Sequence, residues 1–286
     1  MRLGVIGGSG LYALDALADT EWRRIETPFG APSDELLFGR LGGTELVFLP
    51  RHGRGHRLTP GEVPYRANVA ALKAAGCTDV LALSACGSFK EALAPGRFVL
   101  VDQYVDRTRG RARSFFGDGV VAHVSLADPT CNRLGTAVVA AAGDAGIDLV
   151  VGGTYLAMEG PQFSTRAESR AYAAAGLDVI GMTGMPEAAL MREAELCYAA
   201  IAMVTDYDSW REAEAGANVA DILAVMHGNA ENARALVAAV AARMPAARDA
   251  CAAGCDRALE HAIITDPALR PPATVDRLRA VAGRVL

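Results

Sequence analysis

Two carboxylates follow a long apolar run where the sequence reads VTDYDSW. Asp206 and Asp208 come after residues 197–204, all of which are apolar. In an extended chain, residues two positions apart point to the same face, so both carboxylates would lie together at the end of a buried strand. Two close carboxylates separate their pKa values, and one of them can then stay protonated near neutral pH. The pair predicts either acid–base chemistry or, as the alternative, a solvated loop.

The chain begins with an apolar run, residues 3–6, that leads into a glycine-rich loop at residues 7–10. The spacing G-x-G-x-x-A, with Glu26 downstream, matches a dinucleotide-binding fingerprint weakly. Residues 22–25 contradict that interpretation, because the second strand of that fold is buried on both faces and should be apolar. The loop instead predicts a nest in which backbone N–H groups and the Ser9 hydroxyl bind an anion, with a plain strand-to-helix turn as the alternative.

Two further apolar runs end in groups that bind oxyanions. Residues 45–50 lead into Arg51 and His52, and residues 80–83 lead into a stretch that begins with Ser84. Open α/β sheets bind their ligands at the carboxyl ends of strands, so these groups and the glycine loop would meet at one edge. A guanidinium, an imidazole, hydroxyls and backbone N–H groups together form an oxyanion site. Each group alone has a structural explanation, but their convergence predicts an anion site.

A third stretch, MEGPQFSTRAES, places Phe163 and Ser164 just before a predicted helix. Glu159 and Arg166 lie nearby in the sequence. An aromatic ring beside polar donors can stack on a planar base. The alternative is that Phe163 belongs to the core.

Composition limits the class of protein. The chain has 286 residues, of which 51% are hydrophobic, and a formal net charge of −5. These values are typical of a globular protein with a large core, and the acidic balance argues against a nucleic-acid partner. The first residues lack a basic stretch followed by an apolar run, and no segment approaches membrane-spanning length. We therefore expect a cytoplasmic protein that does not associate with membranes.

The 6 cysteines are expected to be reduced thiols. Cys77, Cys86 and Cys197 lie inside apolar runs, as small core residues do. Cys251 and Cys255 are four positions apart in an Ala-rich segment that we predict to be helical, so their thiols would be neighbours on one face. A zinc site needs about four ligands at suitable spacing, which this pair does not supply. We therefore predict core thiols and no metal, with a disulfide between the pair as the alternative.

Apolar runs alternate with Ala-rich segments of helical period, which indicates an α/β fold around a mostly buried sheet. The predicted strands are residues 3–7, 45–50, 80–85, 97–105, 149–159, 178–182 and 197–207. The predicted helices are residues 65–76, 132–146, 164–176, 185–195 and 219–244. We predict a single domain over residues 1–265 and a proline-containing C-terminal tail, residues 266–286, that is at most partly ordered.

From residue 4 to about 210 the chain carries, in order, the motifs IGGSGL, ETPFGAPSD, RHGRGH, YRANVAALKAAGC, SACGS, DQYVDRT, EGPQFSTRAES, GMTGMPEAALMREAELCYA and MVTDYDSW. This series resembles the 5′-methylthioadenosine phosphorylases, which are close relatives of the trimeric purine nucleoside phosphorylases. The sequence is less similar to this family beyond Asp221. Pro64 stands where the family usually has a polar residue and Gln162 where Arg is common. Ser9 and Ser84 stand where Thr is frequent, which keeps the hydroxyl groups.

The resemblance implies a role for each matching residue. The residues implied to bind phosphate are Ser9, Arg51, His52, Ser84, the backbone of Ala85, and Thr183. Those implied to bind the nucleoside are Phe163 at the purine with Ser164 beside it, Met182 at the ribose, and Asp206 and Asp208 at purine N7 and the exocyclic amine. Those implied to form the methylthio pocket are Val219, Ile222 and Leu223, which also share one apolar helical face, with His123 contributed by a neighbouring subunit of a homotrimer.

The resemblance implies a mixed central sheet flanked by helices, and phosphorolysis of 5′-methylthioadenosine to adenine and 5-methylthioribose 1-phosphate in the salvage of methionine and purines. Inorganic phosphate is then a co-substrate, and neither a metal nor an organic cofactor is implied. Such a reaction needs an anionic nucleophile below the anomeric carbon and a proton donor at N7 of the leaving base. Asp206 is the residue expected to protonate N7.

Alternatives remain at this point. A 6-oxopurine phosphorylase acting on methylthioinosine or inosine would present an Asn to the 6-oxo group, which a carboxylate repels. A hydrolytic nucleosidase of similar fold would not need Arg51 and His52. From a different class, a non-catalytic nucleotide-binding module or a dinucleotide oxidoreductase is the alternative.

Overall fold

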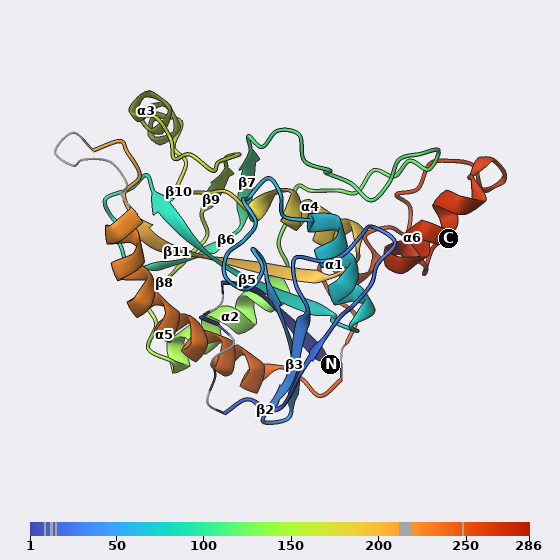
Figure 1. Ribbon diagram of the computed structural model, residues 1–286, viewed down its shortest axis with the longest axis horizontal. Coiled ribbons are helices and arrows are strands. Elements are labelled where there is room, and N and C mark those ends of the chain that lie inside the picture. Colours follow the sequence, from blue (N-terminus) through green and yellow to red (C-terminus); the bar gives the residue numbers. More distant parts are fainter. Residues whose placement is uncertain (9, 12–13, 15, 212–218, 248) are drawn as a thin grey trace.

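The computed structural model describes residues 1–286 apart from 9, 12–13, 15, 212–218 and 248. Within these residues the chain forms an 11-stranded mixed sheet with helices on both faces (Figure 1). The strands are β1 (Arg2–Gly7), β2 (Ala18–Arg23), β3 (Leu36–Leu41), β4 (Thr44–Pro50), β5 (Asp79–Ser88), β6 (Phe98–Val101), β7 (Gln103–Asp106), β8 (Leu149–Val151), β9 (Thr154–Ala157), β10 (Val179–Gly181) and β11 (Cys197–Asp206). The helices are α1 (Tyr65–Ala74), α2 (Asn132–Asp144), α3 (Arg166–Ala174), α4 (Gly184–Glu193), α5 (Val219–Arg243) and α6 (Pro272–Ala282).

Alternate residues of the central strands enter two separate cores. In β5, Val80 and Ala82 pack in the core that α1, α4 and α6 cover, whereas Leu81 and Leu83 pack in the core that α2 and α5 cover. In Figure 1, α5 and α2 accordingly lie on one flank of the sheet, and α1 and α4 lie on the other. Because both faces are covered, the central strands are apolar at nearly every position, and this produces the continuous apolar runs of the sequence.

The strands pair in both directions. β1 runs parallel to β4 and β5, and β11 runs parallel to β5. β2, β3 and β4 are successive antiparallel neighbours, while β10 is antiparallel to β5 and β6 is antiparallel to β11. The predicted α/β fold with a mixed central sheet is therefore confirmed.

Two predicted strands are each divided in the structure. Residues 97–105 form β6 and β7, and residues 149–159 form β8 and β9. The second division falls at Gly152, whose φ of +86° suits glycine, and the N–H of Gly153 donates to Asp102 Oδ1 at 3.0 Å. These turns carry the chain from β6 and β8, on the β11 side of the sheet, to β7 and β9, on the β10 side.

Neither β2 nor β3 has a counterpart among the predicted strands, and the physical reason is clearest for β2. β2 lies at one end of the sheet and is exposed along nearly its whole length, so its sequence lacks the apolar run that marked the buried strands. No helix among the residues that the structure describes is both long and apolar enough to cross a membrane.

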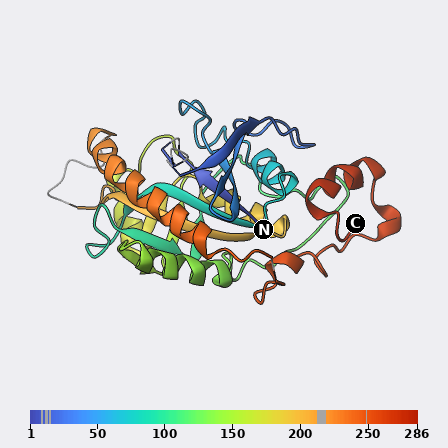
Figure 2. The same ribbon diagram turned by 90° about the horizontal axis from the view of Figure 1, so that it is seen from below.

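The C-terminal tail differs from the prediction of partial order. Residues 266–286 contain a 3₁₀ turn and α6, whose Leu278, Val281 and Ala282 are buried against the core that α1 covers. Arg284 also pairs with buried Glu195 at 2.7 Å. The prolines lie at the start of these two helices, where they favour helix initiation instead of disorder. Figure 2 shows this segment at one end of the molecule.

Candidate active site

A break in the pairing of β5 opens the site. One edge of β5 pairs with β11 from Asp79 to Gly87. Among the described residues, the other edge pairs with β1 as far as Ala82 and with β10 from Gly87 onward, so residues 83–86 lack a strand partner there. Backbone groups in such a stretch need other partners, and the carbonyl oxygen of Leu83 accepts from Arg51 Nη1 at 2.9 Å. The break therefore leaves this stretch of β5 to line a cavity instead of pairing with a strand.

A cavity of about 550 Å³ lies at this break, within the usual size range of small-molecule sites. It contains most of the predicted site residues. Those that line it are Arg51, His52, Ser84, Ala85, Phe163, Met182, Thr183, Asp206, Asp208 and Ile222. The convergence of separate strand ends that the sequence predicted is thus present in the structure.

The remaining predicted residues lie elsewhere or are not described. Ser164 is buried next to the cavity, with its Oγ 3.7 Å from Met158 Sδ. Val219 and Leu223 are 60% and 49% exposed on α5. His123 is exposed, its N–H donates to the Ala262 carbonyl at 2.9 Å, and it is not among the residues that line the cavity. Ser9 lies outside the described residues.

Arg51 is held by a buried carboxylate that the sequence analysis did not predict. Its Nε and Nη2 donate to the two oxygens of Glu187 at 2.8 and 3.0 Å, and Tyr198 donates to the same carboxylate at 2.8 Å. Burial alone would lower the pKa of Arg51, but the charge and hydrogen bonds of Glu187 raise it above its usual value. Each Nη carries a second N–H, so the oriented guanidinium can still donate to an anion in the cavity.

His52 is neutral in this structure. Burial, together with the charge of Arg51, lowers its pKa to about 4, although a hydrogen bond to Leu58 opposes the shift. Its Nδ1 lies 2.8 Å from the Leu58 carbonyl oxygen, which can only accept, so Nδ1 carries the proton. Nε2 is then an acceptor, which suits the P–OH group of hydrogen phosphate better than an anionic oxygen.

Arg111 anchors two of the loops that line the cavity. Its Nη1 donates to the carbonyl oxygens of Met182 and Met185 at 2.7 and 2.9 Å and to the Tyr65 hydroxyl at 3.0 Å. Its Nη2 donates to the Glu159 carbonyl oxygen at 2.8 Å. These bonds join the loop before Phe163 to the turn that precedes α4, and so position Met182 on the cavity wall.

The two aspartates meet through a turn and not through an extended strand. Asp208 has a φ of +51°, and its N–H donates to Asp206 Oδ1 at 2.8 Å, while Thr205 Oγ1 donates to Asp206 Oδ2 at 2.8 Å. The predicted extended geometry is therefore wrong, although both carboxylates do reach the cavity. Asp208 Oδ2 is buried and has no hydrogen-bond partner within the described part of the chain. Burial, assisted by the charge of Asp206, raises the pKa of Asp208.

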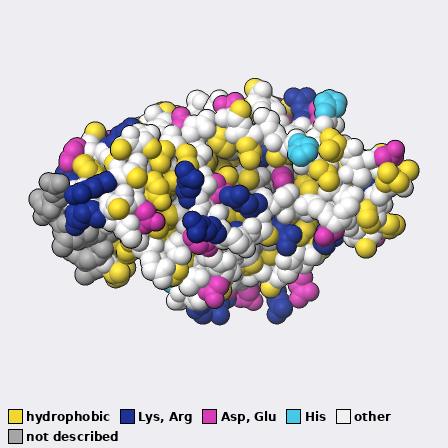
Figure 3. Space-filling view, turned by 90° about the horizontal axis from the view of Figure 1, so that it is seen from above, with side chains coloured by type: hydrophobic (Ala, Val, Ile, Leu, Met, Phe, Trp, Pro, Cys, Tyr) yellow, Lys and Arg dark blue, Asp and Glu magenta, His cyan; other side chains and the backbone are white. Residues whose placement is uncertain are grey.

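The rest of the cavity wall is mainly apolar. Phe163 is 44% exposed at the rim, and Met203, Ile222 and Met226 contribute flexible or branched apolar side chains. Seen from above, the molecule has Lys and Arg side chains among apolar ones, despite the negative net charge (Figure 3). The cavity wall thus combines polar donors, two carboxylates and apolar side chains that can accept a planar or aliphatic group.

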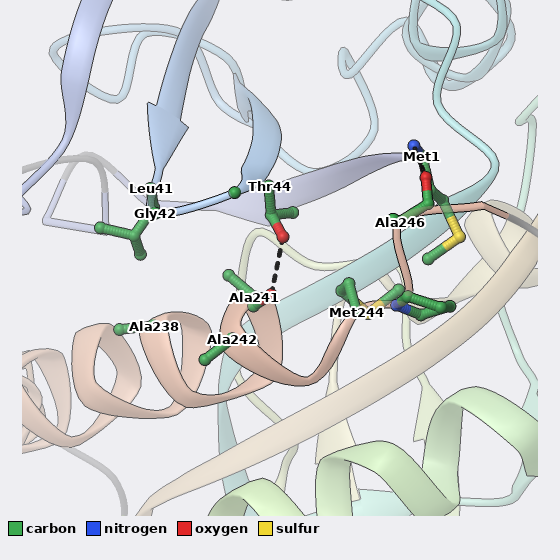
Figure 4. Close-up of a pocket in the computed structure, with 11 residues that line it drawn as sticks. Met1, Leu41, Gly42, Thr44, Ala238, Ala241, Ala242, Met244 and Ala246 are labelled. Carbon is green, nitrogen blue, oxygen red and sulfur yellow. Dashed lines mark hydrogen bonds between the residues drawn. The ribbon is translucent and has the colours of Figure 1, made fainter.

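A second cavity, of about 410 Å³, lies between the β3–β4 turn and the end of α5 (Figure 4). The Thr44 hydroxyl donates to the Ala241 carbonyl oxygen at 2.8 Å there, and the amino group of Met1 donates to Ala246. Its lining residues are otherwise apolar or glycine. They include no titratable side chain, and the only charged group among them is the Met1 amino group, which already donates to Ala246.

Fold and cavity together define an α/β protein with a ligand site at the carboxyl ends of its strands. Residues 2–242 match the family model of the phosphorylase superfamily, and the chain belongs to that superfamily. It is 58% identical over 284 residues to the S-methyl-5′-thioadenosine phosphorylase of Cereibacter sphaeroides, with 99% of this chain and 98% of the relative covered. The corresponding protein of Bradyrhizobium diazoefficiens is 54% identical over 284 residues, with the same coverage.

Solved structures agree with this assignment. A methylthioadenosine phosphorylase sourced from an antarctic soil metagenomic library superposes with a TM-score of 0.91 at 43% identity, covering 98% of both chains. A methylthioadenosine phosphorylase from Schistosoma mansoni, in complex with adenine, gives a TM-score of 0.81 at 40% identity over 85% of this chain and 91% of that one. The family resemblance inferred from the sequence motifs is confirmed.

Proposed function

We propose that this protein cleaves 5′-methylthioadenosine with inorganic phosphate, giving adenine and 5-methylthioribose 1-phosphate. The observation that carries the proposal is that one cavity combines anion donors around Arg51 with the paired carboxylates Asp206 and Asp208. A nucleophilic anion and a protonated leaving base are the two requirements of this phosphorolysis. The names of the relatives at 58% and 54% identity, both methylthioadenosine phosphorylases, support the same substrate.

At the phosphate end, Arg51 supplies a fixed positive charge, and the backbone of Ser84 and Ala85 lies along the unpaired edge of β5. Thr183 lines the cavity just before α4 and offers its hydroxyl to an anion; the regular part of that helix begins only after Met185, whose φ and ψ of −123° and 139° are not helical. Neutral His52 accepts a hydrogen bond from the phosphate hydroxyl, so the other phosphate oxygens are left to face the positive charge of Arg51. This arrangement holds the nucleophile in one orientation, which removes much of the entropic cost of attack on the anomeric carbon.

At the base end, the carboxylate pair carries the proton that the leaving purine requires. Asp206 faces N7 in this proposal, and Asp208 accepts from the 6-amino group. Burial raises the pKa of Asp208, which favours a protonated carboxyl at this end of the cavity, beside the residue that faces N7. Protonation of N7 neutralises the negative charge that develops on the base as the glycosidic bond breaks, and general acid catalysis of this kind contributes roughly 10²–10⁴ in rate.

The methylthio group of the substrate is proposed to lie against Ile222 and Met226 of α5. Val219 and Leu223 on the same helix are 60% and 49% exposed, which suits residues that a neighbouring subunit covers. We propose a homotrimer in which His123 of one subunit completes the pocket of the next. We also expect the enzyme to act in the cytoplasm and to need phosphate but no further cofactor for the reaction.

A product assay with purified protein and 5′-methylthioadenosine tests the proposal. Adenine should form in the presence of phosphate and should not form when phosphate is omitted. Adenine release without phosphate would identify a hydrolytic nucleosidase instead. Faster turnover of methylthioinosine or inosine than of methylthioadenosine would identify a 6-oxopurine phosphorylase, and the absence of any base release would contradict an enzymatic role.

A further inference from the structure

Four cysteines from distant parts of the chain meet in one buried cluster. Cys131, Cys197, Cys251 and Cys255 place their sulfur atoms within 4.8 Å of one another, and each side chain is at most 1% exposed. The sulfur atoms of Cys131 and Cys251 are 3.6 Å apart. All four are free thiols in this structure. We call this group the four-cysteine cluster.

The separations suit a single tetrahedral ion. Four thiolates bound to zinc at about 2.3 Å lie roughly 3.8 Å from one another. The cluster approaches this spacing, with one pair of sulfur atoms at 3.6 Å and every pair within 4.8 Å. An iron–sulfur cluster would need room for several iron and sulfide ions between the thiolates, so these distances favour one ion.

The local chain around the last two cysteines has the form of a metal-binding turn. Cys251 and Cys255 have the C-x₃-C spacing found in zinc sites. They do not lie on one helix as predicted, because the chain turns at Gly254, which has a φ of +69° and donates its N–H to the Cys251 carbonyl at 2.8 Å. This turn brings both thiols to the same point, and the third and fourth thiols come from the start of α2 and of β11.

Positive charge lies against the cluster. Four thiolates and one Zn²⁺ carry a net charge of −2, which is costly to bury without compensation. Arg192 Nη1 donates to Cys255 Sγ at 3.5 Å. Arg133 lies against Cys197, although Asp79 also pairs with this arginine and takes part of its charge. Buried Asp79 would call for Arg133 in any case, but a core of four ordinary thiols would not need the charge of Arg192 beside Cys255.

We propose that the four-cysteine cluster binds a structural zinc ion, with each thiol losing its proton to solvent as it coordinates the metal. The ion would attach the part of the chain that follows α5, which supplies Cys251 and Cys255, to the sheet and to α2. The site is separate from the reaction: Cys197 begins β11 and Asp206 ends it, so nine residue steps, or roughly 30 Å, separate cluster and carboxylates. All four coordination positions are filled by protein, as in structural zinc sites.

The test is the metal content of tag-free protein purified with a phosphine reductant and without chelators or metal columns. Elemental mass spectrometry should find zinc equimolar with the chain. The double variant Cys251→Ser/Cys255→Ser should lose that zinc, whereas Cys77→Ser, which changes a buried cysteine outside the cluster, should keep it. A wild-type protein with four free thiols and no zinc, or with iron in its place, would overturn the proposal.

A second measurement decides the matter even when the double variant fails to fold. Wild-type protein stripped of metal under reducing conditions and titrated with Co²⁺ should develop the intense thiolate-to-cobalt absorption of a tetrahedral sulfur site, and added zinc should abolish it. Cys77→Ser should behave like the wild type. Absence of this absorption, or intact masses showing disulfides among the four cysteines in freshly purified reduced protein, would contradict a zinc site.

Discussion

At the scale of single residues, the site depends on charges that are buried in pairs. Arg51 is 3% exposed, and its guanidinium is bound by the Glu187 carboxylate through two hydrogen bonds. Removing one partner of such a pair leaves an uncompensated buried charge and is usually more destabilising than the pair is stabilising. Arg51→Ala would therefore weaken both phosphate binding and folding, which makes the carboxylates at the other end of the cavity cleaner positions for testing the chemistry.

Asp206→Asn should lower kcat by roughly 10²–10⁴, because the variant cannot protonate the leaving base. The substrate KM should change little, since the proton matters mainly in the transition state. Asn can still accept the hydrogen bond from the Asp208 N–H, so the turn is preserved. Steady-state kinetics with saturating phosphate measures both constants. Near-normal turnover would remove Asp206 from the acid role.

Asp208→Asn should stabilise the protein at neutral pH and have little effect in acid. Burial raises the pKa of Asp208 in the folded state. Below the ordinary Asp pKa of about 4, Asp208 is protonated in both the folded and the unfolded wild-type protein. As the pH rises through the higher pKa of the folded state, the wild type loses stability. Asn escapes that loss and tolerates the φ of +51°. Melting temperatures between about pH 4 and pH 8 test this; a difference that shrinks with rising pH would contradict it.

The matched control is Asp276→Asn, whose side chain is 77% exposed on α6 and pairs weakly with Arg279 at 3.5 Å. It should shift the melting temperature little, and by a similar amount across the pH range, since exposed pairs contribute little to stability.

Asp208→Asn should also reduce the preference for a 6-amino over a 6-oxo purine, because an amide can donate to the oxo group.

At the scale of elements, the junction of β5, β10 and the end of β11 determines where the carboxylates lie. Gly87 is the residue where β5 pairs with both β10 and β11. A Cβ at this position would lie 3.0 Å from Asp206 Oδ1, 3.0 Å from Ile180 Cγ2 and 3.2 Å from Asp208 Cβ. Close approach of the carboxylate pair to β5 thus depends on the missing side chain.

Gly87→Ala should reduce kcat by about tenfold or more while the chain still folds, because small displacements of positioned catalytic groups are costly. Gly143→Ala is the matched control: a Cβ there meets nothing within 4 Å, and alanine favours the α2 helix. Kinetics and circular dichroism of both variants check the result. Unchanged turnover in Gly87→Ala would show that the pair has room to move.

At the scale of the whole molecule, the apolar start of α5 is exposed although it borders the cavity. Val219 is 60% exposed and Met226 37% exposed, and the exposed His123 bonds to Ala262 and does not line the cavity of its own chain. A pocket built only by one chain would leave this face in water. Both observations are explained when a second copy covers the start of α5 and contributes His123.

We therefore expect light scattering to find a homotrimer. We also expect the kcat/KM for methylthioadenosine to exceed that for adenosine by a factor equivalent to roughly 1–3 kcal/mol. Val219→Asp should abolish the preference, because a carboxylate makes the pocket polar. Val139→Asp, at a valine 38% exposed on α2, is the matched control and should keep the preference. An active monomer, or adenosine used as well as the thioether in the wild type, would defeat this prediction.

The sequence alone was sufficient to locate the central strands and the polar groups at their carboxyl ends. The runs that end at Arg51, Ser84 and Asp206 are apolar on both faces because helices cover both faces of the sheet, so their ends could be located and their convergence expected. The motif order also identified the family. These inferences depend on neighbours in the chain and on a general rule for open sheets, and neither requires long-range contacts to be known.

Only the tertiary structure decided which distant groups meet. Glu187 has the sequence pattern of an ordinary helix start, yet it lies 3% exposed against Arg51. Cys197 was expected as an isolated core residue, and Cys251 and Cys255 as one helical face, but the fold brings all three together with Cys131. α6 follows prolines that suggested disorder, but its apolar side chains are buried against a core formed far earlier in the chain. The physical reason is the same in each case: burial and charge pairing depend on which surfaces pack together, and local sequence does not specify that.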